Sequence, residues 1–223
     1  MWSQVERDLE QMLVAKIYRV LLVQDAVYRS FLMFAGLGPN FPSDGQIPSH
    51  LRENLAKAAK IRAHIIVSEI AGMNALEEGT CGAKLVVGAT EFYRFWSSKE
   101  PARRIAPWWF EQSVMTVCRQ QAGKSADDRR QWLREHLAIS LDWSKMDRID
   151  VMSLGGADEV PAVVGKGLPQ RMWSPSALPE GKATSKEYWP NYDKYFPGGV
   201  RQTVFPFIPR VRGEDLKQFL SRG

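Results

Sequence analysis

Three aspartates lie close together in the segment LDWSKMDRID, at Asp142, Asp147 and Asp150. Neighbouring carboxylates can hold Mg²⁺, or share acid and base roles when their surroundings separate their pKa values. Lys145 and Arg148 are interleaved with them and could neutralise them instead. The spacing favours no particular reaction, so the three aspartates are weak catalytic candidates.

The three histidines, His50, His64 and His136, are far apart in the sequence. None has a second ligand at the spacing that would complete a recognisable zinc pattern. His136 lies beside Trp132 on a half-apolar face of an expected helix, which favours a packed, hydrogen-bonded ring over a general base. His136 is therefore a fourth weak catalytic candidate, and we expect neither a metal site nor a cofactor.

Two glycine-containing segments, Gly165-Lys166-Gly167 and Pro197-Gly198-Gly199, could expose backbone N–H groups to a phosphate. Neither is a Walker or dinucleotide fingerprint followed by a clear helix, so turns are favoured. No Gly-x-Ser-x-Gly elbow is present, and the sequence suggests no pairing of a cysteine with a histidine, so nothing indicates nucleophilic hydrolysis. Cys81 and Cys118 are too few for a disulfide framework and lack metal-site spacing, which favours inert thiols in a reducing compartment.

The strongest signal is a basic, aromatic segment from Arg94 to Arg134, with nine Lys or Arg against four acids and four of the eight tryptophans. Phosphates attract cationic side chains, and exposed bases stack on aromatic rings for about 1–3 kcal/mol each. The candidate nucleic-acid contacts are Arg94, Arg103, Arg104, Trp109, Arg119, Arg130 and Arg134. The composition is equally compatible with tryptophans that pack the junction between two halves of the chain and arginines that solvate it.

Within this segment, the pattern predicts a helix from Pro107 to Gly123, because proline suits a first helical turn and glycine can close a helix. Helical phase separates Trp109 from the broad apolar side that includes Trp108. We therefore predict that Trp109 is at least partly accessible and lies on the same surface as Arg119. A Trp109→Ala change should then weaken nucleic-acid binding while leaving the fold intact.

The N-terminal elements that must support these residues are helical. From Val5, apolar residues recur at helical spacing up to Gly36, where a left-handed cap can form. A proline-rich loop precedes a second helix from Ser49 to about Leu76. The stretch from Ile17 to Phe34 is apolar on nearly all sides, so it needs cover from the rest of the chain, a second copy or a partner protein.

The remaining chain has a mixed pattern. Residues 83–98 suit either a buried strand followed by a turn or a helix interrupted at Gly88. Ser125 and Asp128 form a capping-box-like helix start. Short β-like runs follow: Ile149–Leu154 and Val160–Val164 form a hairpin signal, Val200–Ile208 could be a further strand, and a terminal helix is expected from Gly213 to Leu220.

These elements predict an α+β fold, in which a long N-terminal helical hairpin packs on a mixed C-terminal half with two further helices and a small antiparallel sheet. A soft boundary divides residues 1–78 from the basic, tryptophan-rich residues 79–223, although the two parts could form one continuous domain. The chain has 223 residues, is 44% hydrophobic and carries a formal charge of +5. It lacks a secretory start and an apolar run of about 20 residues, so we expect a cytoplasmic location and no membrane segment.

Three functions are compatible with these features. The first is a non-catalytic nucleic-acid-associated module, or a subunit of a nucleoprotein assembly, that uses the basic segment. The second is an enzyme acting on a nucleotide or another phosphorylated ligand, with Arg94 or Arg119 as an anion clamp and one of the three aspartates as acid or metal ligand. The third is a structural subunit that assembles with itself or a protein partner through the first helix.

Overall fold

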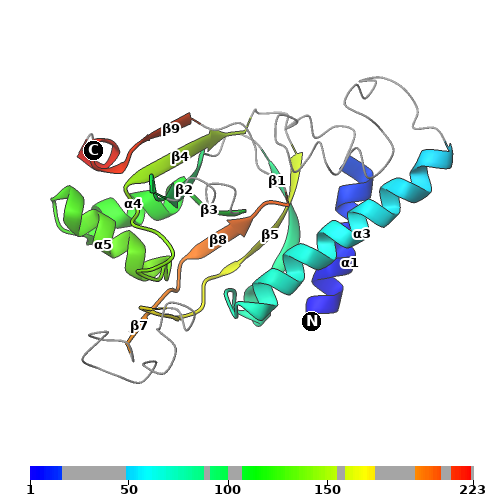
Figure 1. The fold of residues 1–223 in the computed structure, drawn as a ribbon, viewed down its shortest axis with the longest axis horizontal. Coiled ribbons are helices and arrows are strands. Elements are labelled where there is room, and N and C mark those ends of the chain that lie inside the picture. The colour runs from blue at the N-terminus through cyan, green and yellow to red at the C-terminus, as the bar shows by residue number, and fades with distance from the viewer. Residues whose placement is uncertain are drawn as a thin grey trace.

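The computed structural model describes residues 1–16, 49–87, 91–99, 107–154, 159–173, 194–206 and 212–221. Within these ranges the chain forms five α-helices and a seven-stranded antiparallel sheet, as expected for an α+β fold (Figure 1). The helices are α1 (Trp2–Lys16), α3 (Ser49–Gly72), α4 (Gln112–Gln121), α5 (Ala126–His136) and α6 (Leu216–Ser221), with a 3-10 turn η1 (Glu78–Thr80). The strands are β1 (Gly82–Val87), β2 (Glu91–Trp96), β3 (Trp108–Glu111), β4 (Arg148–Ser153), β5 (Glu159–Lys166), β6 (Gln170–Arg171), β7 (Tyr195–Phe196), β8 (Arg201–Val204) and β9 (Arg212–Asp215).

Strand β3 joins the two halves of the sheet, whose order is β1-β5-β8-β3-β2-β4-β9. Trp108 and Trp109 pair with β8, whereas Phe110 and Glu111 pair with β2. Each neighbouring strand therefore forms a ladder with only two of the four residues of β3. A separate ladder between β6 and β7 lies beside this sheet.

One helical layer consists of α1 and α3, which pack against each other and against the β1–β5 end of the sheet (Figure 1). Val5, Leu9 and Leu13 recur every four residues on one face of α1 and enter a cluster with α3 and with Val163 and Val204 of the sheet. Two N-terminal helices thus pack together, and the long hairpin that would join them stays a prediction. The segment that would connect them, the predicted cap Gly36 and the apolar stretch Ile17–Phe34 lie outside the described residues.

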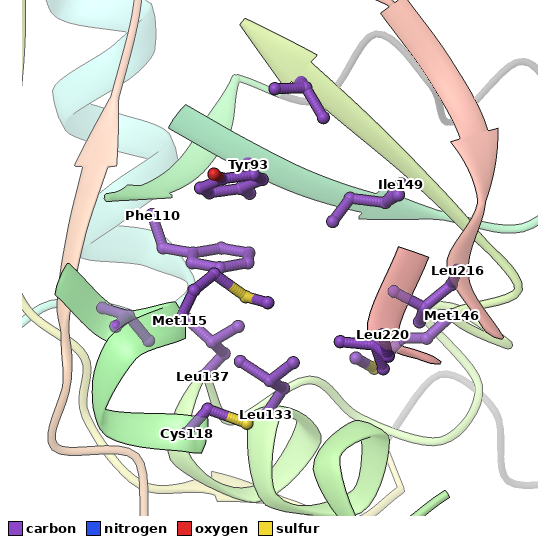
Figure 2. Packing of buried hydrophobic residues seen from close by; sticks show 12 residues of the cluster. Tyr93, Phe110, Met115, Cys118, Leu133, Leu137, Met146, Ile149, Leu216 and Leu220 are labelled. Carbon is purple, nitrogen blue, oxygen red and sulfur yellow. The ribbon is translucent and has the colours of Figure 1, made fainter. Parts of the chain in front are cut away.

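The second helical layer consists of α4, α5 and α6, which cover β2, β3 and β4 (Figure 2). Tyr93, Phe110 and Ile149 point from the strands towards Cys118, Leu133 and Leu220 on the helices. The capping box at the start of α5 is confirmed, since Asp128 N donates to Ser125 Oγ at 3.0 Å and Ser125 N donates to Asp128 Oδ2 at 3.3 Å.

Trp108 and Phe110 are two residues apart, so their side chains lie on the same face of β3. Trp108 packs against the first helical layer, and Phe110 belongs to the cluster beneath the second. Both helical layers therefore cover one face of the sheet, with β3 below the boundary between them.

Several predicted elements need correction. Residues 83–98, which suited either a strand or a helix, contain the two strands β1 and β2. The predicted helix from Pro107 to Gly123 is wrong in its first turn, because residues 108–111 form β3 and α4 begins only at Gln112. Tryptophan and phenylalanine favour a pleated, half-buried surface, and pairing with β8 and β2 outweighs the helix signal of Pro107.

The predicted hairpin between β4 and β5 is also wrong. Strand β4 pairs with β2 and β9, and β5 pairs with β1 and β8. A local turn signal identifies the ends of two strands but cannot decide whether they are neighbours in the sheet. Pro161 lies where β5 pairs with β1 alone, since the β5–β8 ladder starts at Val163, which agrees with an edge-like position.

The prediction of a turn at Gly165-Lys166-Gly167 is wrong, because Gly165 and Lys166 end strand β5 and Gly167 forms an isolated bridge with Leu76. Gly198 and Gly199 have positive φ angles of 65° and 95°. The N–H groups of Gly167 and Gly199 donate to Val200 O and Gly167 O, both at 2.9 Å, so these donors are used within the fold. A Cβ atom on Gly198 would lie 2.7 Å from Leu168 O, which explains why glycine is needed where these two segments meet.

Among the helices that the structure describes, none has both the length and the hydrophobicity needed to cross a bilayer.

Candidate functional site

A cavity of about 560 Å³ lies at the boundary between the two helical layers, beside β2 and β3. Its walls come from four parts of the chain: the end of α3, strands β2 and β3, the segment that follows α5, and the segments around β6 and β8. The lining residues are Glu69, Met73, Ala75, Arg94, Phe95, Trp96, Ser97, Trp108, Trp109, Phe110, Leu137, Ala138, Ile139, Trp143, Ser144, Leu168, Gln170 and Gln202.

The short ladder between β2 and β3 explains why the cavity forms there. The two strands pair only through Phe92–Glu111 and Tyr93–Phe110, whereas β2 pairs with β4 along all six of its residues. Beyond this ladder, Arg94, Phe95 and Trp96 of β2 line the cavity together with Trp108 and Trp109 of β3, and no β2–β3 pair joins them. The change of partner along β3 thus leaves space inside the sheet.

Tryptophan is the most frequent residue type in the wall of the cavity. Trp96, Trp108, Trp109 and Trp143 contribute four of the eight tryptophans of the chain. The indole N–H groups of Trp108 and Trp109 are buried and have no hydrogen-bond partner among the described residues. Buried donors without an acceptor are rare in native proteins and are often satisfied by a water molecule, an ion or a ligand.

A buried ion pair supports one wall of the cavity. Arg94 Nη2 donates to Asp150 Oδ2 at 2.6 Å, and these side chains are only 3% and 0% exposed. The Arg94 guanidinium carbon lies 4.4 Å from the centroid of the Trp109 ring, within cation–π range. Trp96 Nε1 donates to the second carboxylate oxygen of Asp150 at 3.1 Å. Asp150 therefore fixes the arginine and one tryptophan, and the arginine in turn lies over a second tryptophan.

A second buried arginine holds the wall that follows α5. Arg134 Nη1 donates to Ile139 O at 3.1 Å and Ser140 O at 3.2 Å, and Nη2 donates to Ser144 O at 2.8 Å. Burial, with a smaller contribution from Arg130, lowers the pKa of Arg134 to about 10, so the guanidinium stays charged at neutral pH. One side chain thus shapes the loop that presents Trp143 to the cavity.

The structure divides the residues predicted to bind nucleic acid. Arg94, Arg134 and Trp109 are buried, and only Arg119 and Arg130 are exposed among the described candidates. Arg103 and Arg104 lie outside the described residues. The seven residues therefore do not form the single exposed surface that their proximity in sequence suggested.

The prediction that Trp109 is accessible is wrong. Its side chain is 1% exposed, and it belongs to β3 rather than to the polar face of a helix. It packs edge-on against Phe205, with ring centroids 6.4 Å apart. A base cannot stack on this indole unless the surrounding structure opens, so the predicted stacking role is withdrawn.

The three aspartates have separate roles. Asp150 is the buried partner of Arg94, and Asp142 is half-buried in the segment after α5. Asp147 accepts hydrogen bonds from the backbone N and side-chain Oγ of Ser98. Burial acts to raise the pKa of Asp147, but the hydrogen bonds from Ser98 outweigh it and hold this pKa below its usual value. Asp147 thus anchors the end of β2, and its carboxylate is already used for that purpose.

The contacts of His136 are those of a packed, structural side chain. Its ring stacks on Trp132 with centroids 3.9 Å apart, and Nδ1 lies 2.8 Å from Trp132 O. Across the described ranges, no group of three His, Cys, Asp or Glu side chains is placed to hold a metal ion.

Sequence reasoning missed Trp96, Trp108 and Trp143 as members of one site. They come from β2, β3 and the segment after α5, so no spacing in the sequence relates them. The available signal was the number of tryptophans, which was equally compatible with a basic surface and with a packed junction and did not indicate a cavity wall.

No protein-family model, no curated protein and no solved structure matches the chain. The functional conclusion must therefore come from the chemistry of the site itself.

Proposed function

We propose that the chain is a binding protein for a small, flat, largely apolar molecule that occupies the tryptophan-lined cavity. The observation that carries this proposal is a hollow of about 560 Å³ with four indole rings in its wall. Ligand pockets in proteins measure about 300–1,000 Å³ and combine mainly apolar walls with a few polar groups.

The wall composition favours this class of ligand. Indole rings bring large apolar areas at a low cost in side-chain entropy, and they stack on other flat rings. A cavity with apolar walls binds small apolar molecules readily, because water inside it makes few hydrogen bonds. Two charged side chains, Glu69 and Arg94, line the wall, and Arg94 is already neutralised by Asp150 at 2.6 Å, so it does not attract an anion strongly.

Calorimetric titration with naphthylethanol, a flat neutral probe, tests the proposal. Wild-type protein should bind it, and Trp143→Ala should weaken binding by about 10-fold, since the variant lacks one of the four indole rings that can contact the probe. Trp132→Ala is the matched control, because Trp132 is also half-buried but stacks on His136 and does not line the cavity. Affinity in this control should equal that of wild type.

A variant that fills part of the cavity tests whether the probe binds there. Leu168 lines the cavity, and Leu168→Trp should occupy part of it and abolish binding, whereas Leu85→Trp on exposed β1 should not. Unchanged binding by Leu168→Trp would place the probe elsewhere and overturn the proposal. Absence of binding by wild-type protein would overturn it as well.

Nucleic-acid association is a second proposal, supported by exposed cations around the α4–α5 turn. Arg119, Lys124 and Arg130 are exposed there, although Arg130 already pairs with Asp127 at 3.0 Å. Fluorescence anisotropy with labelled single-stranded DNA and RNA should show binding at low salt. The double variant Arg119→Gln/Arg130→Gln should reduce the salt slope by about 0.7 for each phosphate that the protein no longer neutralises. No binding by wild type at low salt would overturn this proposal.

A further inference from the structure

A second hollow of about 350 Å³ adjoins the tryptophan-lined cavity. The two share Met73, Trp143 and Gln170 in their walls, so the same side chains border both. The second hollow is more polar, since Ser140, Arg171 and Tyr195 replace most of the indole rings. The wall that includes Trp143 therefore borders both an apolar space and a polar one.

Arg171 is held in place at this second hollow. It pairs with Tyr195 in the β6–β7 ladder, and its Nε donates to Tyr195 Oη at 3.0 Å. Its guanidinium carbon lies 5.7 Å from the centroid of the same ring, and its backbone O accepts a 2.7 Å hydrogen bond from the buried Ser140 hydroxyl. These contacts fix the backbone and orient the guanidinium without neutralising it.

Arg171 differs from Arg94 and Arg201 in that no carboxylate pairs with its charge among the described residues. Arg94 pairs with Asp150 at 2.6 Å, and Arg201 pairs with Glu111 at 3.7 Å. In the part of the chain that the structure describes, no carboxylate forms an ion pair with Arg171. Its planar fork of N–H donors matches a carboxylate or a phosphate, both of which accept two parallel hydrogen bonds.

We infer that the ligand is amphipathic: its flat apolar body lies among the tryptophans, and an anionic group, a carboxylate or a phosphate, binds Arg171. This inference rests on the proposed function and adds the charge of the ligand and the residue that selects it. Trp143, which borders both hollows, lies at the junction between the two parts of the ligand.

The test compares probes that share one ring system. Calorimetry is carried out with a short series of naphthylalkanoates of increasing chain length, with the matching neutral naphthylalkanols, and with the naphthylalkyl phosphates. At the favourable chain length, wild-type protein should bind the anion about 10-fold more tightly than the alcohol, as expected for hydrogen bonds from a charged donor. The relative affinities of the carboxylate and phosphate probes identify which anion the site prefers.

Arg171→Gln should abolish the preference for the anion and leave the affinity for the alcohol unchanged, which also shows that the variant is folded. Arg7→Gln is the matched control: Arg7 is an exposed arginine of α1 that borders neither hollow, so the preference should persist.

Equal affinity of wild type for anion and alcohol at every chain length would overturn this inference and leave the proposed function intact. A preference that persists in Arg171→Gln, or disappears in Arg7→Gln, would also overturn it. If wild-type protein binds no probe of either kind, the proposed function fails and this inference fails with it.

Discussion

At the scale of single residues, burial rather than residue type decides which contacts the basic and aromatic side chains make. Arg94 and Trp109 have the residue types of a nucleic-acid contact, yet they are 3% and 1% exposed and contact each other. The charge distribution of the indole ring stabilises the Arg94 guanidinium above it, and Asp150 neutralises the charge of Arg94. The same two residue types therefore serve an internal network that borders a cavity.

We expect the removal of one charge from this network to destabilise the protein more than the removal of both charges. Asp150→Leu should destabilise the protein by about 3–5 kcal/mol, because it leaves Arg94 charged and buried without its carboxylate partner. The double variant Arg94→Leu/Asp150→Leu removes both charges and should be about 2 kcal/mol more stable than Asp150→Leu alone. Urea unfolding curves of the single and double variants measure the difference. A double variant less stable than the single one would contradict the role of the buried charge.

The two cysteines should be unreactive in the folded protein. Burial is the main cause that raises the pKa of Cys81 and of Cys118 to about 11, so few thiolates form near neutral pH. At pH 8, both should react with a disulfide reagent about 100-fold more slowly than in unfolded protein. The thiols ionise at lower pH in the unfolded protein than in the folded protein. The contribution of the buried, neutral thiols to the free energy of unfolding is therefore fully present below pH 9 and is lost as the pH rises to about 11. Equal reaction rates in folded and guanidinium-unfolded protein would show that the thiols are not protected.

At the scale of elements, the segment after α5 depends on one arginine. Arg134 binds three backbone carbonyl oxygens of residues 139–144. Ala138 has a φ of 52°, which turns the chain out of the helix at this point. The guanidinium thus connects this loop to the rigid helix.

Arg134→Met should therefore cost about 3 kcal/mol of unfolding free energy, since buried carbonyls lose a charged donor. It should also weaken binding of naphthylethanol, because the loop presents Trp143 to the cavity. Arg130→Met, one turn earlier on α5 and 46% exposed, removes only a surface ion pair and should cost less than about 1 kcal/mol. Thermal unfolding and calorimetry of both variants test this. Equal stabilities of the two variants would contradict the role assigned to Arg134.

At the scale of the whole molecule, two helical layers and two halves of a sheet meet at β3. Phe205, which follows β8, packs edge-on against Phe92 of β2 with ring centroids 5.1 Å apart, and it also contacts Trp109. These rings connect the halves of the sheet on the face opposite Trp108 and Phe110. Trp109 is among the largest fully enclosed side chains at this junction.

Trp109→Ala should consequently destabilise the whole protein by about 3–5 kcal/mol, as expected when a buried aromatic side chain is removed. Unfolding followed by hydrogen exchange should show loss of protection in both β2 and β8. Trp132→Ala, at a half-buried position of α5, is the control and should cost less. Wild-type stability in Trp109→Ala, together with a separate defect in nucleic-acid binding, would restore the stacking role that the buried position excludes.

The sequence by itself determined most of the elements whose signals are local. Ser125 and Asp128 predict the start of α5 because a capping box needs only neighbouring residues. The spacing of Val5, Leu9 and Leu13 predicts one apolar face of α1, since a helix has a fixed period. Alternation and turn residues predicted the β-like runs of the C-terminal half, including those within β4 and β5.

Only the tertiary structure decided which strands are neighbours and therefore which side chains meet. Trp109 is buried because β3 lies between β8 and β2, a pairing that its own four residues do not encode. The cavity lies where β3 changes partners and the two helical layers meet, and the adjoining hollow lies where the end of α3, the segment after α5 and the β6–β7 ladder meet. Periods and caps depend on residues within a few positions of each other, whereas a cavity wall depends on contacts between distant segments, and a single sequence carries no local signal for them.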